Sequence, residues 1–183
     1  KWQHLTMCSD FVDEDAFTDG VMFDGSSIAG WKAINESDMS LIPDPKTSVM
    51  DPFSAQPSMV IFCDVLEPTT GQRYSRDPRS IAKNAEAYLA STGIGDTSYF
   101  GPEPEFFVFD DVRFNVDMQS CFYEFNSEEG PYASGDDMDD GNMGHRPAVK
   151  GGYFPVPPVD GASDLRAEMV TVMKEMGLRM DKH

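Results

Sequence analysis

The stretch that most constrains the fold is residues 100–110, Phe-Gly-Pro-Glu-Pro-Glu-Phe-Phe-Val-Phe-Asp. The aromatic and β-branched residues at 106–109 favour an extended strand. Side chains alternate between the two faces of a strand, so Glu103 and Glu105 point the same way. The two prolines lack an N–H, and this part of the strand cannot be fully paired in the middle of a sheet. We therefore expect a strand end that opens into a cavity.

Two interpretations of this glutamate pair remain open from its spacing. Like charges this close persist when they share a proton, meet arginines or hold cations. A site built from oxygen ligands alone suits Mg²⁺ or Mn²⁺ better than zinc. Alternatively, Glu103 and Glu105 form the solvated face of an edge strand, which is an ordinary surface feature.

The net charge of −18 on 183 residues argues against a partner that is a nucleic acid or an anionic membrane. A phosphate-bearing substrate would need cations to reach so acidic a protein, which favours metal-assisted chemistry. The same charge is also typical of ordinary cytosolic or salt-adapted proteins. The three cysteines show no CxxC spacing, so the sequence indicates neither a disulfide framework nor a zinc site.

Nothing in the sequence predicts a signal peptide or a membrane-spanning run. The chain does not open with Met, and we expect it to be a piece of a longer protein.

Residues 1–76 are expected to contain short strands and turns. The acidic cluster at 10–19 predicts a surface strand or turn, and a short strand is expected at 48–50. The apolar run at 59–66 predicts the central strand of this part of the chain. Between Met22 and Trp31, small turn-forming residues are typical of an ordered loop.

Two helices are expected in the rest of the chain. Asp77-Pro78 has the pattern of an N-cap followed by proline in the first turn, and Gly93 is expected to end this helix. A second domain is expected to start near it. The other helix is expected to be capped near Ser163 and to end at Gly177, with its methionines packed in a core.

Two further segments are distinguished by their charge. The acidic segment 117–144 predicts a solvated loop, and its Asp-rich part at 136–142 lacks the order of ligands of an EF-hand. The segment 145–158 is basic and contains Gly151-Gly152, which allows close backbone approach but matches no phosphate-binding motif.

Taken together, these residues resemble the bacterial type I glutamine synthetase family. The match consists of five motifs that appear in the family's order: Phe-Asp-Gly-Ser-Ser-Ile at 23–28, Asn-Glu-Ser-Asp-Met at 35–39, Asp-Pro-Arg-Ser-Ile-Ala at 77–82, Gly-Pro-Glu-Pro-Glu-Phe-Phe at 101–107 and Gly-Tyr-Phe-Pro at 152–155. They extend over nearly the whole chain, and the five together are highly specific.

The resemblance implies an α+β fold. Residues 1–76 would form the family's small β-grasp domain, and residues 77–183 the first, incomplete part of the catalytic α/β domain with its curved antiparallel sheet. It further implies a cytoplasmic enzyme that assembles as a dodecamer of two stacked hexameric rings. Each active site would lie between neighbouring subunits.

The activity implied by the resemblance is the ATP-dependent ligation of ammonia to L-glutamate. ATP would phosphorylate the side-chain carboxylate to γ-glutamyl phosphate, and ammonia would displace the phosphate. Mg²⁺ or Mn²⁺ would neutralise charge during phosphoryl transfer.

The resemblance also implies roles for individual residues. Glu103 and Glu105 would each bind one of two divalent ions. Asp24 would help to bind ammonium and accept its proton, with Ser27 beside it in the same loop. Tyr153 would line the ammonium pocket.

Asp181 stands where the family usually has a glutamate that contacts the nucleotide, and its side chain is one methylene shorter. The remaining metal ligands and the arginines that bind phosphate and glutamate are expected beyond His183. We therefore expect the isolated 183 residues to be inactive.

Two alternatives stay open at this stage. One is a related carboxylate–amine ligase, such as a γ-glutamyl-amine synthetase. The Asp24 loop argues against it, because an ammonium-binding carboxylate is of little use to a bulky amine. The other is a non-catalytic acidic domain whose glutamate pair lies on the surface.

Overall fold

The computed structural model describes residues 3–138 and 141–182. The chain divides into two compact units, Lys1–Gly101 and Pro102–His183, and each is described by itself below. These compact units do not bear on the domain boundary expected between residues 76 and 77, which stays a prediction.

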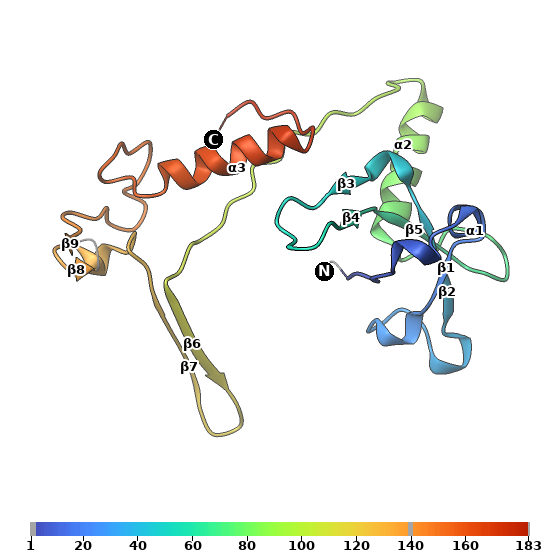
Figure 1. Ribbon diagram of the computed structural model, residues 1–183, viewed down its shortest axis with the longest axis horizontal. Helices are drawn as coiled ribbons and strands as arrows, with labels where there is room; N and C mark the ends of the chain where they lie inside the picture. The colour runs from blue at the N-terminus through green and yellow to red at the C-terminus, as the bar shows by residue number, and fades with distance from the viewer. Residues whose placement is uncertain (1–2, 139–140, 183) are drawn as a thin grey trace. The chain divides into compact units, whose positions relative to one another are not determined.

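The first unit is built on a three-stranded antiparallel sheet with strand order β1-β2-β5 (Figure 1). These strands are β1 (Val21–Asp24), β2 (Asp38–Pro43) and β5 (Cys63–Leu66). Phe23 lies opposite Met39, and Leu41 lies opposite Val65. The central strand is therefore β2.

The prediction of one central strand at 59–66 is wrong. This run is divided into β4 (Met59–Val60), which pairs with β3 (Val49–Met50), and β5 at the edge of the sheet. The break has a local cause, because Phe62 bonds to a turn instead of a strand. Its N–H donates to Thr47 Oγ1 at 2.9 Å, and its carbonyl accepts from the Asp44 N–H at 2.8 Å.

A small aromatic cluster covers one side of this sheet. Met39, Val65 and Tyr74 are buried, and the partly buried Phe23, Trp31 and Leu41 pack against them. The Tyr74 hydroxyl donates to the Trp31 carbonyl at 2.7 Å, and the two rings lie 5.0 Å apart between centroids. The loop that follows β1 is thus packed against the core through Trp31.

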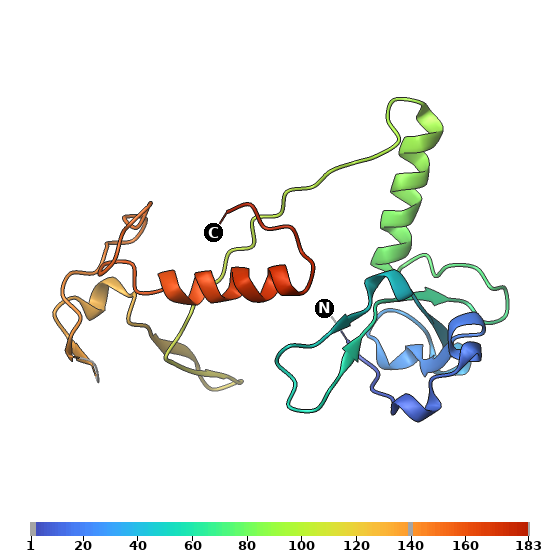
Figure 2. The same cartoon turned by 45° about the horizontal axis from the view of Figure 1, so that its top comes forward.

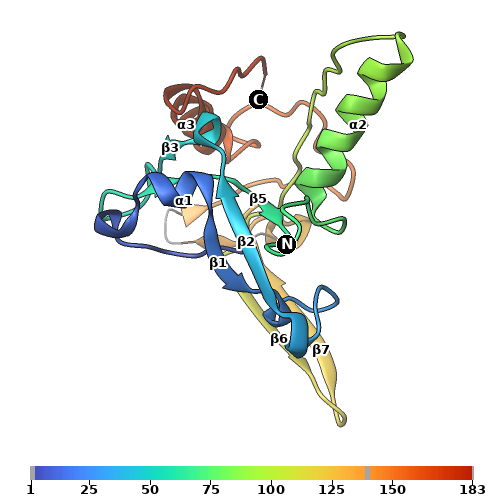
Figure 3. The ribbon, with the colours of Figure 1, turned by 90° about the vertical axis from the view of Figure 1, so that its right-hand side faces the viewer.

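The acidic cluster at 10–19, expected as a surface strand or turn, contains the end of a 3₁₀ turn and a short helix, and no strand. Helix α1 (Glu14–Thr18) begins after Asp13, whose carboxylate accepts a hydrogen bond from the Ala16 N–H at 3.1 Å. This is the expected action of an N-cap aspartate, and the acidic first turn is favourable at a helix N-terminus. Figure 3 shows the neighbouring strands β1 and β2 side by side.

Helix α2 (Pro78–Thr92) confirms its predicted ends. The Asp77 carboxylate accepts from the N–H groups of Arg79 and Ser80, and Gly93 ends the helix with φ 70°. A left-handed residue at this position favours glycine. Figure 2 shows α2 followed by an extended segment.

Ion pairs attach α2 to the sheet of the same unit. Arg79 Nε lies 3.0 Å from Asp64 Oδ1 on β5, and Arg79 Nη2 lies 2.7 Å from Asp44 Oδ2. Lys83 also pairs with Asp64. These contacts join the first two turns of the helix to the β-sheet.

The second unit contains a long hairpin of β6 (Asp111–Val116) and β7 (Cys121–Asn126) (Figure 1). The strand expected from Phe106 therefore begins five residues later, at Asp111. The pairing of β6 with β7 ends there, and residues 101–109 have no partner strand among the described residues.

The acidic segment 117–144 is more ordered than a solvated loop. It contains β7, and the short pair β8 (Asp137–Met138) and β9 (Gly141–Asn142). Residues 139 and 140 of the Asp-rich part lie outside the described residues. The described residues also contain these 3₁₀ turns: η1 (Ser9–Phe11), η2 (Gly25–Ser27), η3 (Ile34–Glu36), η4 (Pro45–Thr47) and η5 (Pro131–Ala133).

Helix α3 (Ser163–Glu175) agrees with the prediction at its C-terminal end, where Gly177 has φ 86°. Its N-terminal cap differs, since Ser163 is already helical and the Asp160 carboxylate accepts from the Ala162 N–H at 3.2 Å. The predicted core packing of its methionines is absent among the described residues, where no α3 residue is buried. None of the described helices has the length and hydropathy needed to cross a bilayer.

Candidate functional site

The loop after β1 arranges hydroxyl and amide groups around the carboxylate of Asp24. Asp24 is the last residue of β1 and the N-cap of η2. Its Oδ1 accepts from the Ser26 N–H at 2.8 Å and from the Ser26 hydroxyl at 2.6 Å. The Ser27 hydroxyl donates to Oδ2 at 3.2 Å. The structure thus brings together the predicted site residues Asp24 and Ser27.

These hydrogen bonds favour the ionised form of the Asp24 carboxylate. The Ser26 hydroxyl first, and then the Ser26 N–H, hold the pKa of Asp24 below its ordinary value. A hydrogen bond to the charged form favours that form. Asp24 is exposed, so its anionic carboxylate can meet a cation from solvent.

Gly25 fixes this loop against the core. Its N–H donates to the Ser37 carbonyl at 2.7 Å, and an added Cβ would lie 2.5 Å from the sulfur of Met39. Met39 is fully buried and has little room to move. Only glycine therefore fits here without a shift of the loop.

A second carboxylate lies across the sheet from Asp24. Asp38, the first residue of β2, is the register partner of Asp24. Side chains directly opposite each other in an antiparallel pair have Cβ atoms about 5 Å apart. Two anions at this end of the sheet make a local environment that attracts cations.

The structure places Glu103 and Glu105 on the surface. Both are exposed and lie in a stretch without strand pairing. At the end of this stretch, the Val108 carbonyl accepts a hydrogen bond from the Ser127 hydroxyl at 2.9 Å. The expected cavity at this strand end is not formed by the described residues.

The donor set of the pair agrees with a hard divalent cation in type but not in number. Two carboxylates supply only oxygen ligands, as Mg²⁺ and Mn²⁺ prefer, but such ions take about six. In the part of the chain that the structure describes, no group of three or more His, Cys, Asp and Glu side chains could hold a metal ion. Two carboxylates alone therefore leave most of the coordination positions of such an ion unfilled.

Tyr153 lies in a loop and is strongly exposed, at 86%. Its ring packs on that of Phe154, with centroids 4.5 Å apart. Asp181 is also exposed and forms a surface ion pair with Arg179, whose Nε lies 3.5 Å from Oδ1. No hydrogen bond or ion pair joins Tyr153 or Asp181 to the glutamate pair among the described residues.

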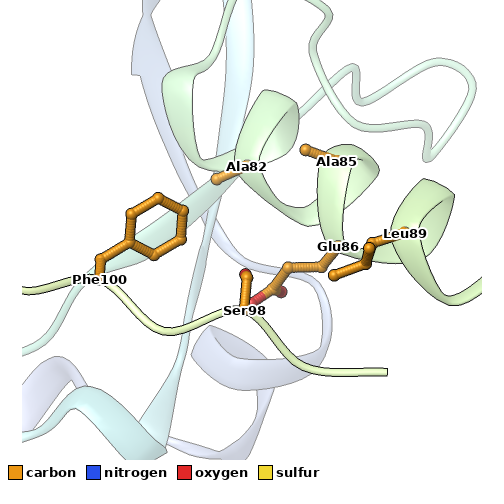
Figure 4. Close-up of a pocket in the computed structure, with 6 residues that line it drawn as sticks. All are labelled: Ala82, Ala85, Glu86, Leu89, Ser98 and Phe100. Atoms are coloured by element: carbon orange, nitrogen blue, oxygen red, sulfur yellow. The ribbon is translucent and has the colours of Figure 1, made fainter. Parts of the chain in front are cut away.

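A hollow in the first unit contains none of these residues. It lies between α2 and the segment that follows the helix, and has a volume of about 320 Å³. Figure 4 shows Phe100 and Leu89 on opposite sides of it. Its lining is mostly apolar: Ala82, Ala85, Glu86, Leu89, Ser98 and Phe100. This lining offers packing surface and little catalytic chemistry.

Sequence reasoning missed Ser26 and Asp38. Ser26 contributes two hydrogen bonds to Asp24, more than the predicted Ser27. A turn in which a carboxylate bonds the backbone two residues later is a common property of Asp, and could have indicated Ser26. Asp38 becomes visible only when the β1–β2 register is known.

Comparison with known proteins gives family matches over almost the whole chain. Residues 1–68 match the family described as "Glutamine synthetase, beta-Grasp domain". Residues 75–183 match "Glutamine synthetase, catalytic domain". The α+β organisation, a β-grasp domain followed by the start of a catalytic domain, agrees with these matches.

Individual relatives extend the comparison. The chain is 67% identical to a glutamine synthetase of Azospirillum brasilense over all 183 residues. It is 55% identical to a protein of Cupriavidus pinatubonensis named 3-hydroxylaminophenol mutase, again over 183 residues. In both cases it spans 39% of the relative's length.

A solved structure supports the fold. The cryo-EM structure of Plasmodium falciparum glutamine synthetase matches with a TM-score of 0.75 at 20% identity. The match covers 94% of this chain and 34% of that one. At this identity the likeness bears on the fold alone.

Proposed function

Because the chain belongs to the glutamine synthetase family in both its β-grasp and its catalytic portions, we propose that the complete protein is a glutamate–ammonia ligase. ATP, L-glutamate and ammonia give L-glutamine, ADP and phosphate. The observation that carries the proposal is the 67% identity to a glutamine synthetase over every residue of this chain.

Asp24 is proposed to bind the ammonium ion. The supporting geometry is an exposed carboxylate whose pKa is held low by Ser26 and Ser27, with Asp38 as its neighbour across the sheet. A low pKa keeps the carboxylate charged and ready to bind a cation. The loop therefore favours binding of ammonium, whose proton is proposed to pass to the Asp24 carboxylate as the nitrogen attacks.

Tyr153 is proposed to complete the ammonium pocket, and Asp181 to contact the nucleotide. Both side chains are exposed, so each can be reached by a ligand or by a further part of the protein. A phenol hydroxyl can accept a hydrogen bond from ammonium, and its ring shields the site from water. The role of Asp181 is proposed with a shorter side chain than the usual glutamate.

Glu103 and Glu105 are proposed to hold Mg²⁺ or Mn²⁺ together with ligands from the rest of the protein. The metal would supply charge neutralisation during phosphoryl transfer. Holding these two exposed carboxylates around one site requires further structure beside them. The remaining three fifths of the length of the Azospirillum brasilense relative would correspond to that structure.

The proposal includes assembly and location. We propose a homo-oligomer, a dodecamer of two hexameric rings with active sites between subunits, that works in the cytoplasm. The support for this assembly is membership of the glutamine synthetase family.

The test is an assay of the complete protein with ATP, glutamate, ammonium and Mg²⁺ or Mn²⁺. We expect glutamine, ADP and phosphate in equal amounts, with ADP formation dependent on glutamate. Asp24→Asn should raise the KM for ammonium, whereas Asp51→Asn, which changes a similarly hydrogen-bonded surface aspartate, should not. Absence of glutamine under these conditions would refute the proposal.

Two other functions are tested in the same assay. The 55% identity to a protein named 3-hydroxylaminophenol mutase makes 3-hydroxylaminophenol a second substrate to try without ATP. Alkylamines in place of ammonia distinguish a γ-glutamyl-amine synthetase. If the protein binds no metal and turns over none of these substrates, the non-catalytic acidic domain is favoured.

A further inference from the structure

The guanidinium of Arg146 is buried, with the residue only 4% exposed, and bonds two separate parts of the chain. Its Nη1 donates to the Val159 carbonyl at 3.1 Å, and its Nη2 donates to the Met143 carbonyl at 2.8 Å. Its backbone N–H donates to Ser134 Oγ at 2.9 Å. One residue thus links three stretches of the second unit.

These bonds close the base of a loop. Arg146 directly precedes residues 147–158, and Val159 directly follows them. The bond from Nη1 to the Val159 carbonyl therefore joins the two ends of a twelve-residue segment. This segment carries Tyr153.

The loop has little support of its own. Within it, the Gly151 N–H donates to the Ala148 carbonyl at 2.7 Å, while Tyr153 and Phe154 are 86% and 84% exposed. Lys150 and Phe154 adopt left-handed φ values of 62° and 51°. Non-glycine residues hold such conformations only when the surrounding structure imposes them. The bond that joins the two ends of the loop limits the conformations open to it.

Residues just after the loop strengthen its base. The Asp160 carboxylate forms two hydrogen bonds with the Arg166 guanidinium on α3, and the Asp160 N–H donates to the Val156 carbonyl at 3.1 Å. The Gly161 N–H donates to Glu129 Oε1 at 2.9 Å. The C-terminal end of the loop is thereby attached to α3 and to the segment after β7.

The chemistry of arginine suits this place. A guanidinium is a planar fork that can bond two carbonyls at once, whereas a lysine ammonium is a single point charge on a flexible stem. Within the described residues, the Arg146 Nε is buried without a hydrogen-bond partner. Leaving a buried donor without a partner is unfavourable. The bonds to the Val159 and Met143 carbonyls are therefore the contacts that hold the guanidinium in place.

We propose that Arg146 is a positioning residue that clamps the base of the loop 147–158 and so sets the position of Tyr153. The link from the loop to ammonium rests on the proposed function. The clamp itself rests only on the contacts above.

The experiment compares three variants of the complete protein. Arg146→Met removes every side-chain donor, Arg146→Lys keeps the charge, and Arg113→Met is the control. Arg113 is an exposed hairpin residue, paired with Asp111 at 2.8 Å. Hydrogen exchange is measured for the backbone amides of residues 147–158, and KM values are measured for ammonium and ATP.

In Arg146→Met we expect exchange in the loop to become about tenfold faster, because the restraint on local opening is lost. The KM for ammonium should rise about tenfold with a smaller change in that for ATP, since misplacing one contact affects the ligand that it touches. Arg146→Lys should give an intermediate result, and Arg113→Met none.

Unchanged exchange in the loop would overturn the clamp. Faster exchange with an unchanged KM for ammonium would support the clamp and refute the assignment of Tyr153 to the ammonium pocket. If Arg146→Met does not fold, Arg146→Lys carries the same test, because an ammonium cannot replace the planar fork that bonds the Val159 and Met143 carbonyls together. Its loop should exchange faster than that of the parent protein, and no change there would again overturn the clamp.

Discussion

The hydroxyl of Ser26 donates a 2.6 Å hydrogen bond to Asp24 Oδ1, and the N–H of the same serine donates to that oxygen at 2.8 Å. The loop therefore contains its own means of keeping the carboxylate ionised. A cation that approaches Asp24 meets a group that is already charged.

Ser26→Ala should raise the pKa of Asp24 towards its ordinary value. A lowered folded-state pKa stabilises the fold above the unfolded pKa, and this contribution is lost as pH falls through the folded pKa. In the variant, protonation begins at higher pH, so ammonium binding should weaken at a higher pH than in the parent protein. The KM for ammonium as a function of pH measures this.

Ser54→Ala is the matched control for that experiment. The Ser54 hydroxyl donates to Asp51 at 2.6 Å and is the main cause that lowers the pKa of Asp51. Its removal should change the titration of Asp51 and leave the pH profile for ammonium unaltered. Equal effects of the two substitutions would contradict the role of Asp24.

Asp77→Ala should destabilise α2 by about 1–2 kcal/mol, the usual effect of losing an N-cap side chain. The carboxylate caps two backbone N–H groups and accepts from the Ser80 hydroxyl at 2.9 Å. Asp77→Asn keeps an oxygen acceptor and should lose less. The thermal midpoint, measured at one protein concentration, compares the variants; an unchanged midpoint for Asp77→Ala would contradict the prediction.

Asp64→Asn should loosen the attachment of α2 to β5. Burial alone would raise the pKa of Asp64, but hydrogen bonds from Lys83 and Arg79 outweigh it and the pKa is lowered. Breaking hydrogen bonds to charged groups of this kind costs about 1.5–3 kcal/mol. The stabilisation is present above the unfolded pKa of Asp64 and is lost as pH falls through its folded pKa.

The pH dependence of unfolding checks the Asp64 prediction. The parent protein should lose stability on acidification more steeply than Asp64→Asn, whose side chain does not titrate. Parallel curves for the two proteins would show that the ion pairs add nothing.

Glu103→Gln and Glu105→Gln in the complete protein should each weaken Mn²⁺ binding by at least about tenfold, because a neutral amide is a poorer ligand for a hard cation than a carboxylate. Calorimetric titration with Mn²⁺ alone measures this. Glu124→Gln, at an exposed position on β7, is the control. Affinity that stays the same in all three variants would favour a surface role for the pair.

The isolated 183 residues should be inactive and should self-associate. On one face of the hairpin, Val112 lies opposite Phe125 and Phe114 lies opposite Tyr123, and all four are exposed. Apolar strands left uncovered tend to pair with other chains. Amidation assays and light scattering test both expectations; a monodisperse, catalytically active monomer would contradict them.

The sequence predicted most reliably those features that depend on neighbouring residues. The ends of α2 follow from Asp77, Pro78 and Gly93 alone, because caps act within one turn. The Asp24 loop likewise depends on a few adjacent residues, and Ser27 lies where it was expected relative to Asp24.

Features that depend on distant pairing were harder to predict. The run at 59–66 is apolar enough for a central strand, but the bonds of Phe62 with the 44–47 turn divide it. The segment 101–109 has the composition of a strand and no partner to pair with among the described residues. Strand propensity reflects packing against neighbours, which local sequence does not contain.

Gly25 has a practical consequence for mutational screening. Any side chain at this position would press on the buried Met39 and shift the turn that holds Asp24, although the strands on either side could remain intact. A library randomised at residue 25 and sorted first for expression should therefore be rich in well-produced, non-functional clones. Such clones show how the conformation of the turn affects activity when the protein is still well folded. The polar side chains of Asp24, Ser26 and Ser27 are the same in these clones as in the parent protein.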